Sequence, residues 1–285
     1  MAKNNVIVIT DSTCDLSQEL IDKNDIKVIY MKLAFDEDIF QDRIEMNSTQ
    51  LYEEVKKRNI MPKTMAVTPI VFSEEFKKHL QGNNEIIYCG IGSKFSGTFQ
   101  NALFAKNELD KDKIHLLDSQ NLSSGSGLLL LKICQLRDKG YAAKDIVERV
   151  SKYVPNIRTA FAINNFEYLH KGGRCSGMAK IFGTLLKIKP IIRVVDGGMI
   201  VAKKPHGKMK KALDVLLEYV EEDRKNIEDG FVFVTHSKAH DEALYLESQL
   251  KERFKMKDVV ITDAGSIISC HCGPGTTGIL YIVKK

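Results

Sequence analysis

The sequence predicts an α/β protein built from two α/β domains, and two patterns lead to this prediction. In the first half, short apolar runs alternate with amphipathic stretches of helix length, which is typical of a mainly parallel sheet covered by helices. In the second half, Asp196-Gly197-Gly198 separates two β-branched runs and predicts an antiparallel hairpin, so a mixed sheet is expected there. We place the two domains at residues 1–155 and 156–285.

Strands are expected where β-branched runs are bounded by turn residues, and helices where apolar residues recur at helical spacing. Ser48 is expected to cap the first long helix, and Asp11-Ser12-Thr13 to form a capping turn after the first strand. The first half is expected to hold strands at about 6–10, 28–34, 64–67, 86–90 and 114–117, and helices at about 48–58, 72–80, after Ser96, 123–139 and 143–153.

The second half is expected to hold strands at about 157–163, 190–195, 199–202, 231–235, 258–262 and 278–283. Helices are expected at about 166–170, around Leu213 to Val220 and at 241–254. The glycine-rich segment 265–278 is expected to be a loop. Within it, strand-like alternation would point Cys270 and Cys272 to one side and His271 to the other.

Composition excludes several classes of protein. With 44% hydrophobic and 28% charged residues the chain has an ordinary globular composition, and no apolar run approaches the roughly 18 residues of a membrane span. The net charge of +5 is mild and scattered, without the aromatic and basic interleaving of a nucleic-acid interface. The N-terminus lacks the layout of a signal peptide, so a cytoplasmic location is expected.

The six cysteines are dispersed and are expected to be reduced thiols. The run Cys270-His271-Cys272 contains two kinds of zinc ligand, but no second cysteine or histidine pair completes a set of four. We therefore expect no metal site.

Three segments rich in hydroxyl groups and turn residues are the strongest functional signal. They are Thr64–Pro69, Ser93–Thr98 and Gly265–Gly278, and two of them follow a predicted strand directly, where an α/β sheet presents its ligand site. Together they offer Thr64, Ser93, Ser96, Thr98 and His271 with almost no carboxylate. Such a set suits a small anionic group, and because it is poorly supplied with general bases it favours binding over turnover.

The segment from Ser93 to Thr98 leads from a strand ending at Gly90 into a helix. A helix start exposes unpaired N–H groups and a partial positive charge, which suit a carboxylate or phosphate. Ser96 is also expected to serve as the N-cap of this helix. The glycines here miss the Gly-x-Gly-x-x-Gly spacing, which argues against a dinucleotide site.

Two other functional classes stay open at the level of sequence. Ser96 and His271, oriented by Asp11 or Asp118, would form a hydrolase or phosphotransferase acting on a small acyl or phosphate substrate, although no Gly-x-Ser-x-Gly elbow is present and Asp263 is the only acid near His271 in sequence. A regulatory protein that binds a small phosphate is the other class.

Six short motifs point to one family. In order, they are ITDSTCDLS, Pro62-Lys63-Thr64, SGTFQNA from Ser96, KGGRCSG, KIKPII before the hairpin, and His271 followed by GPG. Over about residues 5–284 the chain resembles the DegV family of bacterial fatty-acid-binding proteins. The resemblance implies a DegV-like fold of two α/β domains with a ligand tunnel between them.

The resemblance also implies a function: a non-enzymatic carrier of a long-chain fatty acid such as palmitate or oleate. The carrier presents the bound carboxylate to a separate fatty acid kinase for phosphorylation, needs no cofactor, and contacts membranes at most transiently. By the same resemblance, Thr64 and Ser96 hold the carboxylate, His271 completes the polar end, and Arg174 lies near the pocket mouth.

The remaining site assignments concern the pocket wall. Ser93, Phe95, Thr98, Phe161 and Ile267 are expected at the mouth or in the lining, and the segment 171–186 as a lid. Phe99, Leu169, Met178, Ile181 and Leu185 are further lining candidates. The chain departs from the family in two places: Met65-Ala66-Val67 follows Thr64 where Ser-Gln-Pro is usual, and Cys270 and Cys272 flank His271.

Overall fold

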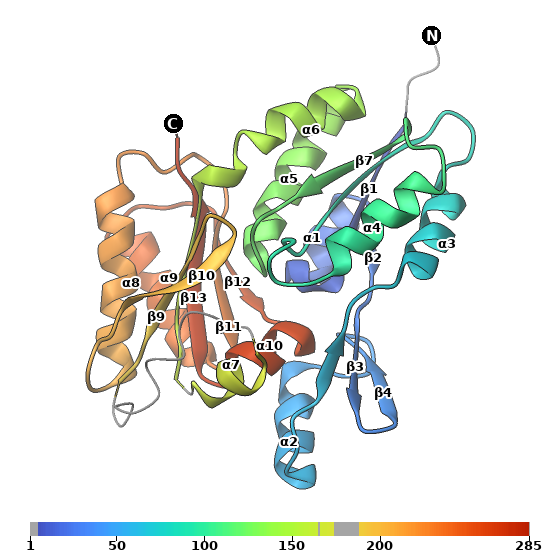
Figure 1. The fold of residues 1–285 in the computed structure, drawn as a ribbon. Coiled ribbons are helices and arrows are strands. Elements are labelled where there is room, and N and C mark those ends of the chain that lie inside the picture. Colours follow the sequence, from blue (N-terminus) through green and yellow to red (C-terminus); the bar gives the residue numbers. More distant parts are fainter. Residues whose placement is uncertain (1–4, 165, 174–187, 285) are drawn as a thin grey trace.

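The structure is a computed structural model that describes residues 5–164, 166–173 and 188–284. Its first layer is a parallel sheet (Figure 1). Four strands lie in the order β2-β1-β6-β7. All the pairings among them are parallel, which confirms the predicted sheet of the first half. The strands are β1 (Val6–Asp11), β2 (Ile26–Ile29), β6 (Glu85–Gly90) and β7 (Ile114–Asp118).

Helices cover both faces of this sheet. Strand β1 alternates: Val6 and Val8 pack with α1, α5 and α6, whereas Ile9 packs with α3 and α4. A strand buried on both sides explains the nearly continuous apolar run at residues 6–10. The helices are α1 (Gln18–Lys23), α3 (Pro69–His79), α4 (Thr98–Asn107), α5 (Ser124–Asp138) and α6 (Ala143–Ser151), with short 3₁₀ turns η1 (Ser12–Cys14) and η2 (Val154–Asn156).

A second, three-stranded sheet in the order β4-β3-β5 lies below the first, beside α2 (Ser48–Arg58) (Figure 1). Its strands are β3 (Lys32–Phe35), β4 (Asp38–Gln41) and β5 (Lys63–Met65). The prediction of one strand at 28–34 is wrong, and β4 was missed. At Met31 the N–H donates to Ser12 Oγ and the carbonyl accepts from Asp42, so the chain leaves the first sheet there.

The N-cap of α2 also differs from the prediction. Asn47, not Ser48, caps the helix: its side chain accepts from the Gln50 N–H, and the Gln50 side chain accepts from the Asn47 N–H. This reciprocal pair is a capping box, which satisfies two helix-end donors where a serine cap satisfies one. The predicted turn at Asp11 is confirmed, since its carboxylate accepts from the Thr13 N–H.

The third sheet has six strands in the order β10-β9-β8-β13-β11-β12. Only β11 and β12 pair in parallel, which confirms the mixed sheet, and Asp196 and Gly197 turn the predicted hairpin with positive φ angles of 49° and 72°. Its strands are β8 (Ile157–Ala162), β9 (Ile191–Val195), β10 (Gly198–Lys203), β11 (Val232–Ser237), β12 (Val259–Asp263) and β13 (Thr276–Ile282).

Helix α5 joins the two large sheets into one layered body (Figure 1). Leu129 and Ile133 of α5 belong to one core cluster with Val8 of the first sheet and with Phe233 and Leu280 of the third. The opposite face of the third sheet packs against α8 (Met209–Asp223) and α9 (His240–Glu252), and the short α7 (Glu167–Lys171) follows β8.

Segment 265–278, predicted as a loop, is mostly helix and strand. Residues Ser266–Cys272 form α10, and β13 begins at Thr276 rather than at Gly278. Serine, cysteine and isoleucine are mediocre helix formers, and seven residues are too few to show helical periodicity, so the sequence signal was weak. The strand-like alternation predicted for Cys270, His271 and Cys272 is also wrong, because these residues lie in a helix, where side chains do not alternate between two faces.

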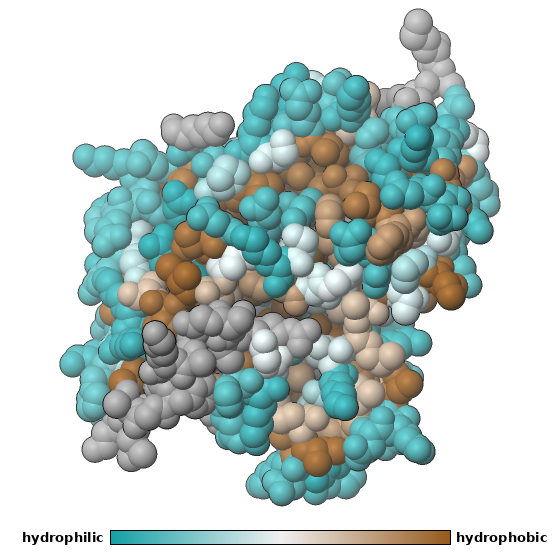
Figure 2. All heavy atoms as spheres, in the orientation of Figure 1, coloured by the Kyte–Doolittle hydropathy of each residue, from teal (hydrophilic) through white to brown (hydrophobic). Residues whose placement is uncertain are grey.

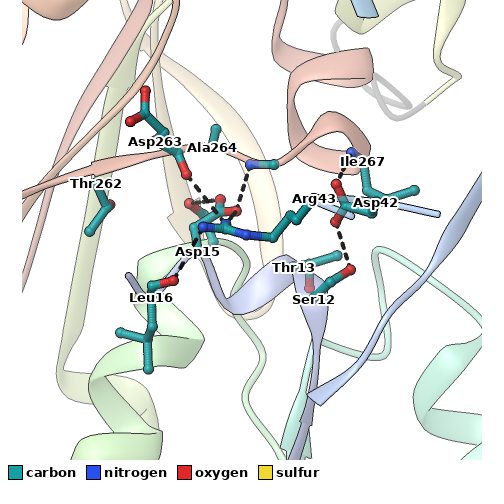
Figure 3. A network of polar contacts seen from close by, with 12 residues as sticks. Ser12, Thr13, Asp15, Leu16, Asp42, Arg43, Thr262, Asp263, Ala264 and Ile267 are labelled. Atoms are coloured by element: carbon teal, nitrogen blue, oxygen red, sulfur yellow. Dashed lines mark hydrogen bonds and ion pairs between the residues drawn. The ribbon is translucent and has the colours of Figure 1, made fainter. Parts of the chain in front are cut away.

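Two buried carboxylates join the loops of the first half to the start of α10 (Figure 3). Asp42 accepts from Ser12 Oγ (2.6 Å) with one oxygen, and with the other from the Ser266 N–H (2.6 Å) and Ser266 Oγ (2.7 Å). Asp15 accepts from the Gly265 N–H (2.8 Å) and pairs with Arg43 (3.1 Å). We call Asp15, Asp42 and Arg43 the carboxylate latch.

Burial raises the pKa of Asp15 to about 7, against the lowering influence of Arg43 and of the Gly265 and Ser123 donors. A carboxyl group with a raised folded-state pKa contributes stability at low pH that is lost as the pH rises toward that pKa. Between pH 5 and 8, the free energy of unfolding of the wild type should therefore fall relative to Asp15→Asn by roughly 2 to 3 kcal/mol. Urea unfolding of both proteins at the two pH values measures this, and parallel pH profiles would contradict it.

Candidate functional site

A cavity of about 220 Å³ lies where the small sheet, the start of α4, helix α10 and strand β8 meet. Thr64, Ser96 and His271 contribute its polar groups, and most of the other side chains are apolar. In the view of Figure 2, hydrophilic residues cover much of the surface, and hydrophobic residues reach it in the upper middle, on the left, and at the right and lower margins. The lining residues are Met31, Thr64, Ala66, Ile91, Phe95, Ser96, Gly97, Leu122, Phe161, Leu169, Met199, Ile267, Ile268, His271 and Cys272.

The polar part of the cavity is organised around one hydrogen bond. Thr64 Oγ1 and His271 Nε2 lie 3.1 Å apart, although the two residues are 207 positions apart in the chain. Thr64 projects from β5, whose backbone pairs with Leu33 of β3. His271 is in the last turn of α10. Ile267, Ile268 and Cys272 of the same helix also line the cavity. These α10 residues follow the i, i+4 spacing of one helix face.

Ser96 lies just before α4 and lines the cavity. The prediction that it is the N-cap is wrong, because the helix starts at Thr98 with Gly97 as the cap. Ser96 Oγ accepts from the Thr98 N–H (3.2 Å) and lies 2.9 Å from Thr98 Oγ1. Thr98 itself is buried and outside the lining, so its contribution is to orient the Ser96 hydroxyl.

Four of the other predicted residues line the cavity, and the remainder lie elsewhere in the fold or outside the described residues. Phe95, Phe161, Ile267 and Leu169 line it, whereas Phe99, on α4, is partly buried and packs against the core of the first sheet. Ser93 is exposed and bonds Asp118 (2.6 Å) instead of lining the cavity. Arg174, Met178, Ile181, Leu185 and most of the predicted lid lie outside the described residues.

Sequence reasoning missed several lining residues. Met31 and Ile91 follow strand ends, and Leu122 precedes α5, so each is one more apolar residue in a loop and carries no distinguishing pattern. The recurrence of apolar residues on α10 was the one usable signal, but it required the segment to be recognised as a helix first. The missed lining residues are Met31, Ala66, Ile91, Gly97, Leu122, Met199, Ile268 and Cys272.

The residues of a catalytic triad are not assembled. Asp11 is buried and accepts from the Tyr88 hydroxyl (2.8 Å) and the Ile91 N–H (2.9 Å), and Asp118 bonds Ser93. Asp263 lies 3.4 Å from His236, a different histidine. No carboxylate belongs to the lining of the cavity among the residues that the structure describes.

The cysteines beside His271 are structural. Burial raises the pKa of Cys272 to about 12, so its thiol stays protonated and is a poor nucleophile at neutral pH. Cys270 is buried and its thiol donates to the carbonyl of Pro62 (3.6 Å), next to β5. Within residues 5–164, 166–173 and 188–284, no group of three histidine, cysteine or acidic residues is placed to hold a metal ion.

One known protein family matches this chain over almost its whole length. The family model described as "Uncharacterised protein, DegV family" matches residues 5–284. The chain belongs to the DegV family. A DegV domain-containing protein of Clostridium acetobutylicum is 33% identical over 277 residues, 97% of this chain and 98% of the relative. One from Clostridium perfringens is 31% identical over 96% of this chain and 97% of its own length.

Solved structures of DegV proteins share the whole fold. A DegV protein of Thermus thermophilus, described by its fatty acid binding, superposes with a TM-score of 0.92 at 24% identity, covering 98% of this chain and 99% of its own. DegV of Bacillus subtilis, described as a fatty acid binding protein, superposes with a TM-score of 0.88 at 25% identity over 99% and 100% of the two chains. A stearic acid-binding protein of Eubacterium ventriosum has a TM-score of 0.86 at 22% identity over 100% and 99%. The DegV fold is thereby shown for this chain.

Helix α7 supports His271 from behind, through a glycine. A Cβ atom on Gly172 would overlap Nδ1 of His271, although the φ angle of −69° is ordinary for alanine. Gly172→Ala is expected to push the imidazole away from Thr64 and to lower the free energy of unfolding by about 1 to 3 kcal/mol, because the site is overpacked. Histidine side-chain NMR and urea unfolding measure the two effects.

Gly198→Ala is the matched control, since the nearest atom to its new Cβ is 3.8 Å away. It should leave the His271 resonances in place. Unchanged His271 resonances in Gly172→Ala would show that the ring does not depend on α7.

Proposed function

We propose that this chain binds a long-chain fatty acid such as palmitate or oleate, with the carboxylate at Thr64, Ser96 and His271 and the tail along the apolar wall. The observation that carries the proposal is the composition of the cavity: two hydroxyls and an imidazole face into a space whose other side chains are almost all apolar. Solved DegV proteins described as binding fatty acids have the same fold, which supports the assignment.

The tail supplies most of the binding free energy in this proposal. Each buried methylene contributes about 0.8 kcal/mol, so a 16-carbon chain contributes on the order of 10 kcal/mol before the costs of association. Leu122, Phe161, Ile268 and Cys272 also line a second cavity of about 40 Å³, which extends the apolar path toward β11 and β13. The hydroxyls and imidazole then orient the head group and offset its desolvation.

The proposed role is that of a carrier, which presents the carboxylate to a fatty acid kinase instead of transforming it. The lack of a carboxylate in the described lining supports this, since no acidic side chain stands beside the head group to act as a general base or to orient His271 as one. We propose further that residues 1–155 and 156–285 are the two domains. The transfer of the bound fatty acid to the kinase is proposed to take place in the cytoplasm, with transient membrane contact of the carrier. No helix in the described part of the chain is long and apolar enough to cross a bilayer.

Removing either hydroxyl should weaken binding without unfolding the protein. Thr64→Ala and Ser96→Ala are each expected to reduce palmitate affinity by about tenfold, the value of one lost hydrogen bond to a charged group. Calorimetric titration of defatted protein measures the affinities. Ser93→Ala is the matched control, because that hydroxyl bonds Asp118 and lies outside the cavity. Full affinity in both site variants would remove the proposed polar end.

Mass spectrometry of an organic extract of the purified protein tests the ligand directly. A long-chain fatty acid at about one per chain is the expected result. The loaded protein should then yield acyl phosphate only when a fatty acid kinase and ATP are both added. An empty extract together with no uptake of palmitate or oleate would contradict the proposed function.

A further inference from the structure

Two of the three polar residues of the cavity, Thr64 and His271, lie on separate elements and contact each other through their side chains. Thr64 belongs to the three-stranded sheet, since β5 pairs with β3 and β3 pairs with β4. His271 belongs to α10, which lies between β12 and β13 in the chain. The 3.1 Å contact between the two residues therefore depends on how α10 is held against the small sheet.

Asp42 lies at that junction. It follows β4 directly, and its backbone N–H bonds the carbonyl of Met31 (2.9 Å), so it is part of the same unit as Thr64. The side chain is fully buried, and one of its oxygens accepts from the Ser266 N–H (2.6 Å), Ser266 Oγ (2.7 Å) and the Ile267 N–H (3.4 Å). These are donors of the first turn of α10, which has no partners for them within the helix.

The rest of the carboxylate latch holds the approach to α10. Asp15 accepts from the Gly265 N–H, and Arg43 donates to the carbonyls of Asp263 (3.4 Å) and Leu16 (3.3 Å) (Figure 3). Ser123 donates to the other oxygen of Asp15 (2.6 Å). Asp15, Arg43 and Ser123 have positive φ angles of 49°, 65° and 54°, a conformation that non-glycine residues keep only where surrounding contacts hold them.

The first turn of α10 also leaves little freedom around Asp42. A Cβ atom on Gly265 would lie 2.8 Å from Asp42 Oδ1, so only glycine lets the backbone approach the carboxylate this closely. His271 is four residues beyond Ile267, or about 6 Å along the helix axis. A change in the direction of α10 at the latch is therefore transmitted to the imidazole and to the wall residues between.

We infer that Asp42 is a positioning residue for the fatty-acid head group: it touches no cavity surface, but by binding the first turn of α10 to the small sheet it sets the alignment of His271 with Thr64. This inference rests on the proposed function. It assigns control over the affinity of the cavity to a fully buried carboxylate that lies next to the cavity lining but is not part of it. The weak Cys270–Pro62 contact is a second tie between α10 and β5, and it is expected to leave part of the alignment in place when Asp42 is changed.

A double-mutant cycle tests the inference. Asp42→Asn keeps the shape of the side chain but presents an amide in place of the carboxylate that gathers the α10 donors. It is expected to reduce palmitate affinity by about tenfold. In that background, Thr64→Ala should cost less than about threefold, compared with about tenfold in the wild type, because the pair it disrupts is already misaligned. The affinities are measured by calorimetry well below the unfolding temperature.

The cycle separates positioning from stability. Asp223→Asn is the control. This carboxylate, at the end of α8 and outside the cavity lining, accepts from the Tyr281 hydroxyl (2.9 Å). Its loss should lower stability while leaving both the affinity and the cost of Thr64→Ala unchanged. A full tenfold cost of Thr64→Ala in the Asp42→Asn background would overturn the inference. If Asp42→Asn does not fold, Ser266→Ala takes its place, since it removes one donor from the same carboxylate; additive effects there would overturn the inference as well.

The outcomes also distinguish this inference from the proposed function. A wild-type protein that takes up no fatty acid contradicts the proposed function itself. A wild type that binds palmitate and an Asp42→Asn variant that binds it equally well contradict only the positioning role.

Discussion

The arrangement of this protein depends on two carboxylates buried at the junction of its sheets. Asp15 and Asp42 are fully buried. Buried carboxylates are tolerated only where hydrogen-bond donors and a cation replace the hydration that they lose on folding. Those donors come from the turn after β1 and from the first turn of α10, and the cation is Arg43. The hydrogen bonds of these two carboxylates therefore join the turn after β1, the end of β4 and the start of α10, which no single sheet connects. The cavity forms directly beside this junction.

The cavity itself combines two kinds of wall. Apolar side chains from β8, α7 and α10 supply a non-directional surface, which suits a chain of methylenes. The Thr64 and His271 pair supplies direction, and a hydroxyl beside an imidazole can both donate and accept. A long-chain carboxylate matches both walls at once. The described lining contains no acidic side chain, so the imidazole and the hydroxyls are its polar groups.

Predictions from the sequence were most reliable where residues within one element or turn determine its structure. The parallel strands at Val6 and Ile86 and the hairpin at Asp196 were predicted correctly, because burial on both faces and turn chemistry are local properties. These predictions failed where distant residues decided. The break at Met31 is made by Ser12 and Asp42, and α10 is held by carboxylates more than 200 positions away.

The sequence by itself determined the α/β class and the hydroxyl-rich segments, because strand and turn propensities act over a few residues. Through its motifs it also determined the DegV resemblance. It placed Thr64, Ser96 and His271 in one set, and the structure puts all three in one cavity. Only the tertiary structure decided that Ser93 bonds Asp118 instead of lining the cavity, and that Asp42 binds the first turn of α10. The physical reason is that a hydrogen bond is satisfied by whichever partner folding brings within about 3 Å, and sequence spacing does not encode that partner.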